Sequence, residues 1–88
     1  ERKLAAFYFE EGLGLFNSQK YEESIHWLKK SKEIDQDLNY NYLLFHKLGL
    51  ALFNINLIED SIIEFEKAIN LNPGNADLHS ARASLGRF

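Results

Sequence analysis

The chain has 88 residues, of which 45% are apolar and 26% are charged, as expected for one small globular domain. Its formal net charge of −3 argues against a nucleic-acid-binding surface, which is normally basic. It has no cysteine for a disulfide or a thiolate metal site, and no apolar run approaches the roughly 18 residues that a membrane span requires. Position 1 is not methionine, so we expect the chain to be a fragment of a longer protein.

One pattern of apolar and turn residues occurs twice. The segment EGLGLFNSQKYEESIHWLKKSKEI (11–34) aligns without gaps with LGLALFNINLIEDSIIEFEKAINL (48–71). Gly12 aligns with Gly49, which sets the offset at 37 residues. Because turn residues match as well as apolar residues, we interpret the chain as a duplicated unit.

Each unit is predicted to contain two helices. Apolar residues recur at three- and four-residue spacing in the first half of each unit, which is typical of a helix. Asparagines in 17–18 and 54–56 are expected to end these first helices, because asparagine accepts the left-handed backbone of a helix terminus. The second helices are expected from about Tyr21 to Asp35 and from about Leu57 to Leu71.

Short signals mark where the later helices begin and end. Asn56 and Glu59 resemble a capping box at the start of the fourth helix. Pro73 and Gly74 end that helix, and Asn75 is expected to cap a fifth helix that runs from Ala76 towards Arg87. The sequence shows no alternation typical of strands, so the chain is predicted to be all-helical.

The two aligned glycines predict how the helices of each unit pack. A glycine inside a helix costs about 1 kcal/mol relative to alanine, so Gly12 and Gly49 suggest a packing reason. We expect the second helix to approach closely there through small residues, with Ser24 facing Gly12 and Ser61 facing Gly49.

The second unit resembles the tetratricopeptide repeat, a helix-turn-helix of about 34 residues. The residues that carry the resemblance lie between Tyr42 and Asn75: Phe45, Leu48, Gly49, Ser61, Phe65, Ala68 and Pro73. The first unit, about 5–38, fits less closely, because Glu11 replaces a leucine and Gln36 replaces the proline of the family. A longer link at 36–41 leaves the angle between the two repeats open.

The resemblance implies an all-α fold of antiparallel helix-turn-helix repeats, stacked as a short right-handed superhelix (α-solenoid) of five helices. It implies a single domain over residues 1–88. Repeat one would occupy about 5–38 and repeat two 42–75, followed by a capping helix or truncated third repeat at 76–88.

The polar residues form no pattern typical of an enzyme. His26, His46 and His79 match no metal-ligand spacing, and no nucleophile elbow, phosphate loop or EF-hand is present. We therefore expect no catalytic residue, no metal, no cofactor and no enzymatic function. A metal sensor or enzyme that uses His46 or His79 is the remote alternative.

A second apolar row on each first helix predicts an interaction surface. In the tetratricopeptide repeat family the first helices line a concave groove that receives a partner peptide or helix. Carried over by position, the resemblance implies these groove residues: Phe9, Leu13, Phe16, Asn17, Leu43, His46, Leu50, Phe53 and Asn54. Stacking of neighbouring first helices would bury part of these rows, Phe16 and Phe53 above all.

The implied function is a protein-interaction module whose mostly apolar groove binds a peptide or amphipathic helix of another protein. The lysine and asparagine that grip chaperone C-terminal carboxylates in some family members are replaced by Phe9 and Leu13, so no partner of that kind is expected. The alternative is an assembly module that uses the same surface to form a homodimer or to pack on further repeats. Nucleic-acid and membrane partners are not expected. A cytoplasmic location is expected.

Overall fold

The computed structural model describes residues 2–34 and 41–85. This part of the chain contains five helices and no strand: α1 (Arg2–Asn17), α2 (Tyr21–Ile34), α3 (Asn41–Asn54), α4 (Ile58–Leu71) and α5 (Ala76–Leu85). The prediction of an all-helical fold is therefore confirmed. The expected ends of the second helix at Asp35 and of the fifth at Arg87, and most of the link at 36–41, lie outside the described residues.

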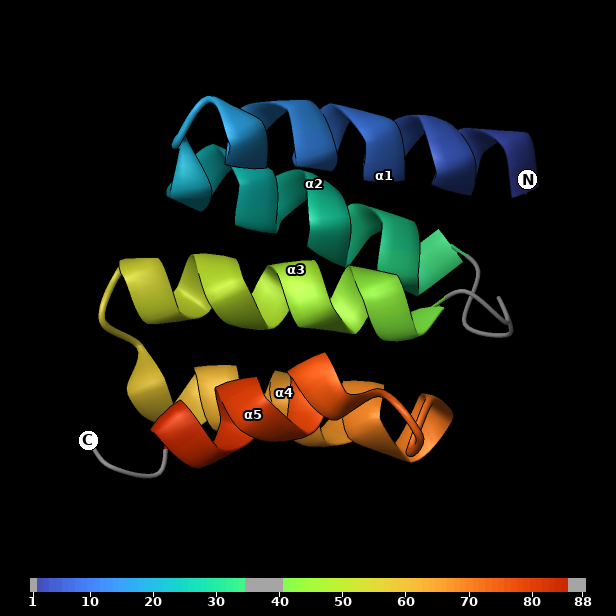
Figure 1. The fold of residues 1–88 in the computed structure, drawn as a ribbon. Helices are drawn as coiled ribbons and strands as arrows, with labels where there is room; N and C mark the ends of the chain where they lie inside the picture. The colour runs from blue at the N-terminus through green and yellow to red at the C-terminus, as the bar shows by residue number, and fades with distance from the viewer. Residues whose placement is uncertain (1, 35–40, 86–88) are drawn as a thin grey trace.

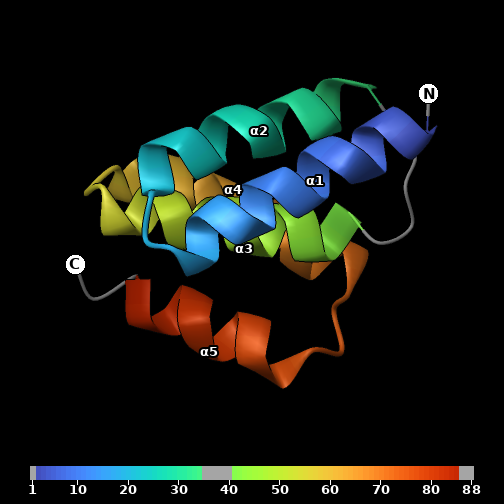
Figure 2. The same cartoon turned by 90° about the horizontal axis from the view of Figure 1, so that it is seen from above.

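The helices form two stacked hairpins followed by a single helix (Figure 1). The α1–α2 hairpin packs on the α3–α4 hairpin mainly through α2 and α3, and α5 packs on α4. Seen from above, α2 and α5 lie on opposite sides of α1 (Figure 2). The molecule is thus a short helical stack, in which α1 is the outermost helix at one end.

Both hairpins turn through a left-handed residue. Gln19 (φ 64°) and Asn56 (φ 69°) occupy equivalent positions and have positive φ values. The Lys20 N–H donates to the Leu15 carbonyl at 2.9 Å, and the equivalent bond closes the second hairpin. This bond is typical of a Schellman helix end. In the first unit the left-handed residue is therefore Gln19 and not an asparagine.

The predicted capping box at the start of α4 is wrong. Leu57 is the N-cap of α4 and makes no side-chain capping hydrogen bond, because Asn56 already serves as the left-handed residue of the preceding turn. The prediction for α5 is confirmed. The Leu78 N–H donates to Asn75 Oδ1 at 3.2 Å, which satisfies one of the free N–H groups of the first turn.

The buried serines hold the two helices of each hairpin together. The Ser24 hydroxyl donates to the Gly12 carbonyl at 2.7 Å, and the Ser61 hydroxyl donates to the Gly49 carbonyl at 2.8 Å. Both serines are fully buried, so the hydrogen bonds satisfy hydroxyl groups that water does not reach. The serines therefore contribute a polar contact as well as small size.

The glycines are the points of closest approach between the helices, and Ser24 and Ser61 face them as predicted, but a large side chain of the second helix also packs against each glycine. A Cβ atom on Gly12 would lie 2.7 Å from Leu28 Cδ2, and a Cβ atom on Gly49 would lie 2.8 Å from Phe65 Cδ2. Leu28 and Phe65 are both fully buried. Each glycine thus makes room for a large side chain of the second helix.

Apolar side chains join the two hairpins in one core. Its buried members come from α1, α2 and α3: Phe9, Ile25, Leu28, Leu44, Leu48, Ala51 and Leu52. The only tryptophan of the chain, Trp27, is half-buried in α2, and its ring lies 5.3 Å from that of Tyr8 in α1. In the part of the chain that the structure describes, no helix has the length and apolar character to cross a membrane.

Candidate functional site

The three faces of α3 have different surroundings. Leu44 and Leu48 belong to the core that α3 shares with α1 and α2, while Gly49 faces Phe65 of α4. The remaining face carries half-buried side chains that follow the helical period: Leu43, His46, Lys47, Leu50 and Phe53. On this face α3 is not fully covered by the neighbouring helices.

The structure places most of the predicted groove residues on partly exposed faces of α1 and α3. Six of them are half-buried: Leu13, Phe16, Leu43, His46, Leu50 and Phe53. Asn17 and Asn54 are exposed at the ends of the two helices, and Asn54 Nδ2 donates to the Leu50 carbonyl at 2.8 Å. Leu13 and Phe16 also pack against the core, so their exposed parts form a surface supported from below.

Phe9 has to be removed from the predicted groove surface. Its side chain is only 9% exposed and belongs to the core that joins the two hairpins. Phe9 of α1 faces α3, because Leu44 and Leu48 of α3 belong to the same buried cluster. Phe9 therefore stabilises the stacking of the repeats and offers little area to a ligand.

The structure adds Lys47 to this surface. Its half-buried side chain crosses from α3 to α1, and Nζ lies 5.3 Å from the centroid of the Phe16 ring. The Phe16 ring in turn contacts Tyr21, with centroids 5.4 Å apart. The sequence signal was present, because Lys47 interrupts the apolar row of Leu43 and Leu50 at helical spacing.

His46 lies on α3 and is half-buried. Its ring packs edge-on against Phe65, with centroids 5.5 Å apart. Burial lowers the pKa of His46 below 6.5, the Lys47 charge lowers it further, and Asp77 of α5 raises it. The imidazole is therefore neutral near pH 7 and suits a largely apolar surface.

We name these seven residues the groove surface: Leu13, Phe16, Leu43, His46, Lys47, Leu50 and Phe53. Two of its seven side chains, those of His46 and Lys47, carry nitrogen, and none carries a carboxylate. Chemically, the surface offers apolar contact over two repeats together with a single permanent positive charge.

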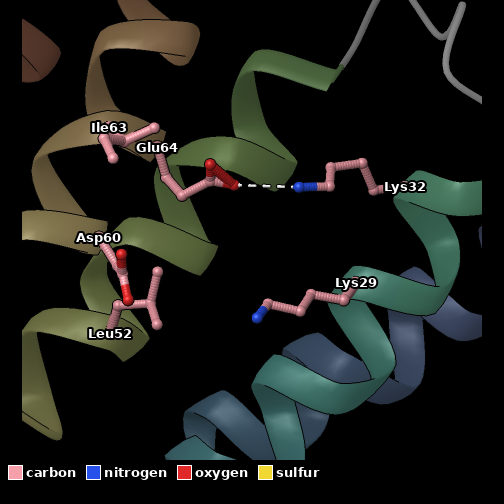
Figure 3. A pocket seen from close by; sticks show the side chains of 6 residues that line it. All are labelled: Lys29, Lys32, Leu52, Asp60, Ile63 and Glu64. Carbon is pink, nitrogen blue, oxygen red and sulfur yellow. Dashed lines mark hydrogen bonds and ion pairs between the residues drawn. The ribbon is translucent and has the colours of Figure 1, made fainter. Parts of the chain in front are cut away.

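A hollow on the second helices offers a different environment. This pocket of about 200 Å³ lies between α2 and α4 (Figure 3), and its lining residues are Lys29, Lys32, Leu52, Asp60, Ile63 and Glu64. Lys32 Nζ lies 3.3 Å from Glu64 Oε1, and Lys67 Nζ lies 3.0 Å from Glu64 Oε2. These ion pairs neutralise the buried carboxylate of Glu64, and the pair with Lys32 of α2 bridges the two hairpins.

The described residues contain no cluster with the chemistry of a metal site. No group of three or more histidine and carboxylate side chains in residues 2–34 and 41–85 is placed to hold a metal ion.

Comparison with known proteins identifies the second hairpin. Residues 43–75 match the family model of the tetratricopeptide repeat. The second hairpin is a tetratricopeptide repeat. The predicted resemblance to this family is thus confirmed for residues 43–75.

Two solved structures resemble this chain in fold. A MamA mutant is 27% identical over 92% of the chain, with a TM-score of 0.82, and the chain spans 43% of that structure's length. The first TPR of Spaghetti (RPAP3), bound to the HSP90 peptide SRMEEVD, is similar over 99% of the chain and 94% of its own length. Its identity of 16% and TM-score of 0.53 indicate a shared fold alone. A comparison with curated proteins gives no match.

Proposed function

We propose that this chain is a protein-interaction module whose groove surface binds an apolar segment of a partner protein. The observation that carries the proposal is a set of half-buried apolar side chains on α1 and α3 that the five described helices leave partly uncovered. Apolar surface that remains exposed to water is typical of interaction sites when it is contiguous.

The spacing along α3 favours a helical partner. Leu43 and Phe53 are ten residues apart, about 15 Å along the helix axis, which is the length of roughly three helical turns. An amphipathic helix that presents apolar residues at three- and four-residue spacing would cover this length. An extended apolar segment is the alternative ligand.

The positive charge at Lys47 adds a preference to the apolar contact. A partner helix with one acidic residue beside its apolar stripe would pair with Lys47, whose ammonium already lies over the Phe16 ring. The RPAP3 domain binds an HSP90 peptide. We do not expect the same peptide to bind here, because Phe9 and Leu13 occupy the positions at which a carboxylate would be gripped.

Assembly through the same surface is the second candidate function. Short repeat arrays require caps or neighbours to cover their open faces, so further repeats or a second copy could fill the groove surface. We also propose that residues 1–88 form one domain in which the helix after Asn75 acts as a cap or as part of a third repeat. The cytoplasmic location and the lack of enzymatic function stay predictions.

A displayed library of helical peptides, selected against the chain, tests the proposal. The selected peptides should bind with an apolar stripe, and the double variant Leu13→Glu/Leu50→Glu should lose them while keeping its helical circular dichroism spectrum. The matched control is Ile63→Glu/Leu71→Glu, because these α4 side chains are 51% and 50% exposed and lie outside the groove surface. Equal binding to wild type and to the groove variant would show that the groove surface is not the site.

A further inference from the structure

One position occurs in all three first helices but is covered in only two of them. Phe7, Leu44 and Leu78 are equivalent, since Leu44 lies 37 residues after Phe7 and Leu78 lies 34 residues after Leu44. Leu44 and Leu78 are fully buried, because α2 packs on α3 and α4 packs on α5. Phe7 is 49% exposed. Figure 1 shows the reason, since α1 is the last described helix at its end of the stack.

The exposed residues around Phe7 are charged as well as apolar. We define the α1 back face as five exposed residues: Lys3, Leu4, Phe7, Glu10 and Glu11. Its apolar part is Phe7 with Leu4, which is 47% exposed. Glu11 occupies the position of Leu48, which is fully buried in α3. The face therefore combines an apolar centre with a cation at one end and two carboxylates at the other.

This arrangement of charges is complementary to itself. Lys3 lies four residues before Phe7 and Glu11 lies four residues after it, so all three share one side of α1. When two copies of α1 pair in antiparallel orientation with Phe7 opposite Phe7, Lys3 of each copy comes opposite Glu11 of the other. We propose that the α1 back face binds the same face of a second copy of this chain and forms a two-fold symmetric dimer.

The charge of Glu11 favours a second copy over a helix of the kind that covers α3. In the α2–α3 contact the equivalent residue, Leu48, is packed among apolar side chains. A helix that covered α1 with apolar side chains, as α3 is covered, would bury the Glu11 carboxylate without a partner, which is costly. A second copy instead brings a lysine to each Glu11, while Phe7 and Leu4 lose their contact with water.

The dimer does not depend on the proposed function of the groove surface. Leu13 is six residues from Phe7 and therefore lies about 120° away around α1. The dimer leaves the groove surfaces of both copies open, so peptide binding and dimerisation can be measured separately.

Sedimentation velocity over a wide concentration range tests the proposal. The wild-type chain should show a monomer–dimer equilibrium, and Phe7→Glu should weaken dimerisation by about tenfold or more, because it places two like charges at the symmetry axis. Leu71→Glu is the matched control, since Leu71 is 50% exposed on α4, and it should leave the equilibrium unchanged. Circular dichroism checks that each variant keeps its helical content.

Charge exchange provides the decisive comparison. Lys3→Glu and Glu11→Lys should each weaken the dimer, and the double variant should restore it, because the pairs re-form with opposite polarity. A chain that stays monomeric throughout the range would overturn the proposal, whether another helix or nothing covers Phe7. A dimer that Leu13→Glu/Leu50→Glu disrupts and Phe7→Glu does not, or a double charge variant as weak as the single variants, would overturn it as well.

Discussion

Replacing Gly49 by alanine tests the helix packing with a single methyl group. The new Cβ atom would lie 2.8 Å from Phe65 Cδ2, 2.9 Å from Phe65 Cε2 and 3.3 Å from the Ser61 carbonyl oxygen. Phe65 is fully buried, so its ring cannot move into solvent to make room. Alanine gains about 1 kcal/mol in helix propensity, whereas overpacking a tight core typically costs 1–3 kcal/mol. We expect Gly49→Ala to lower the free energy of unfolding by about 1 kcal/mol.

Gly14 offers a matched control on a first helix. A Cβ atom on Gly14 would meet nothing within 4 Å, so Gly14→Ala should gain the propensity term alone and stabilise the chain by about 1 kcal/mol. Thermal unfolding followed by circular dichroism should therefore give a lower Tm for Gly49→Ala and a higher Tm for Gly14→Ala, each shifted by about 4–8 °C. The unfolding measurements should be made at a low chain concentration, where self-association does not contribute to the stability. If both variants raised Tm equally, Gly49 would not be a tight contact.

Two further predictions concern α5 and the groove surface. Asn75→Ala removes the acceptor of the Leu78 N–H and should lower the free energy of unfolding by about 1 kcal/mol in urea. An unchanged free energy of unfolding would mean that Asn75 does not cap α5. His46 has a lowered pKa in the folded chain, so the unfolded chain binds more protons and the free energy of unfolding should fall as pH drops below 6.5. His46→Gln should flatten this part of the pH profile, and Asp77→Asn should steepen it, because Asp77 raises the pKa of His46. A profile that is the same in wild type and His46→Gln would contradict the assignment.

The sequence predicted the helices and their tight contacts because both leave local signals. The 37-residue offset places Gly12 and Gly49 at equivalent points, and the structure confirms close packing at both. The sequence could not show which side chain fills the space beside each glycine, because a serine and a bulky side chain one turn later both fit the spacing. The role of Asn56 was ambiguous for a similar reason, since asparagine is favoured both as an N-cap and in left-handed turns.

The limits of the groove surface depend on how the repeats are stacked, which the sequence does not encode locally. A helical wheel gives the direction of Phe9 but not the area that α3 covers, and that area depends on the angle between the hairpins. Phe9 therefore looked accessible and proved to be buried. Lys47 was overlooked because an isolated lysine in an apolar row is usually solvated, whereas here its ammonium lies over the Phe16 ring of the other hairpin.

The single tryptophan makes the first hairpin optically distinct from the second. Trp27 is half-buried against Tyr8, so its emission should change when α1 and α2 separate, while far-ultraviolet circular dichroism reports all the helices at once. Neighbouring repeats are coupled mainly through their shared interface, which here includes Phe9 and Leu44. Coincident transitions from the two signals would mean that this interface transmits unfolding between the hairpins. Separate transitions would mean that the interface couples the hairpins only weakly.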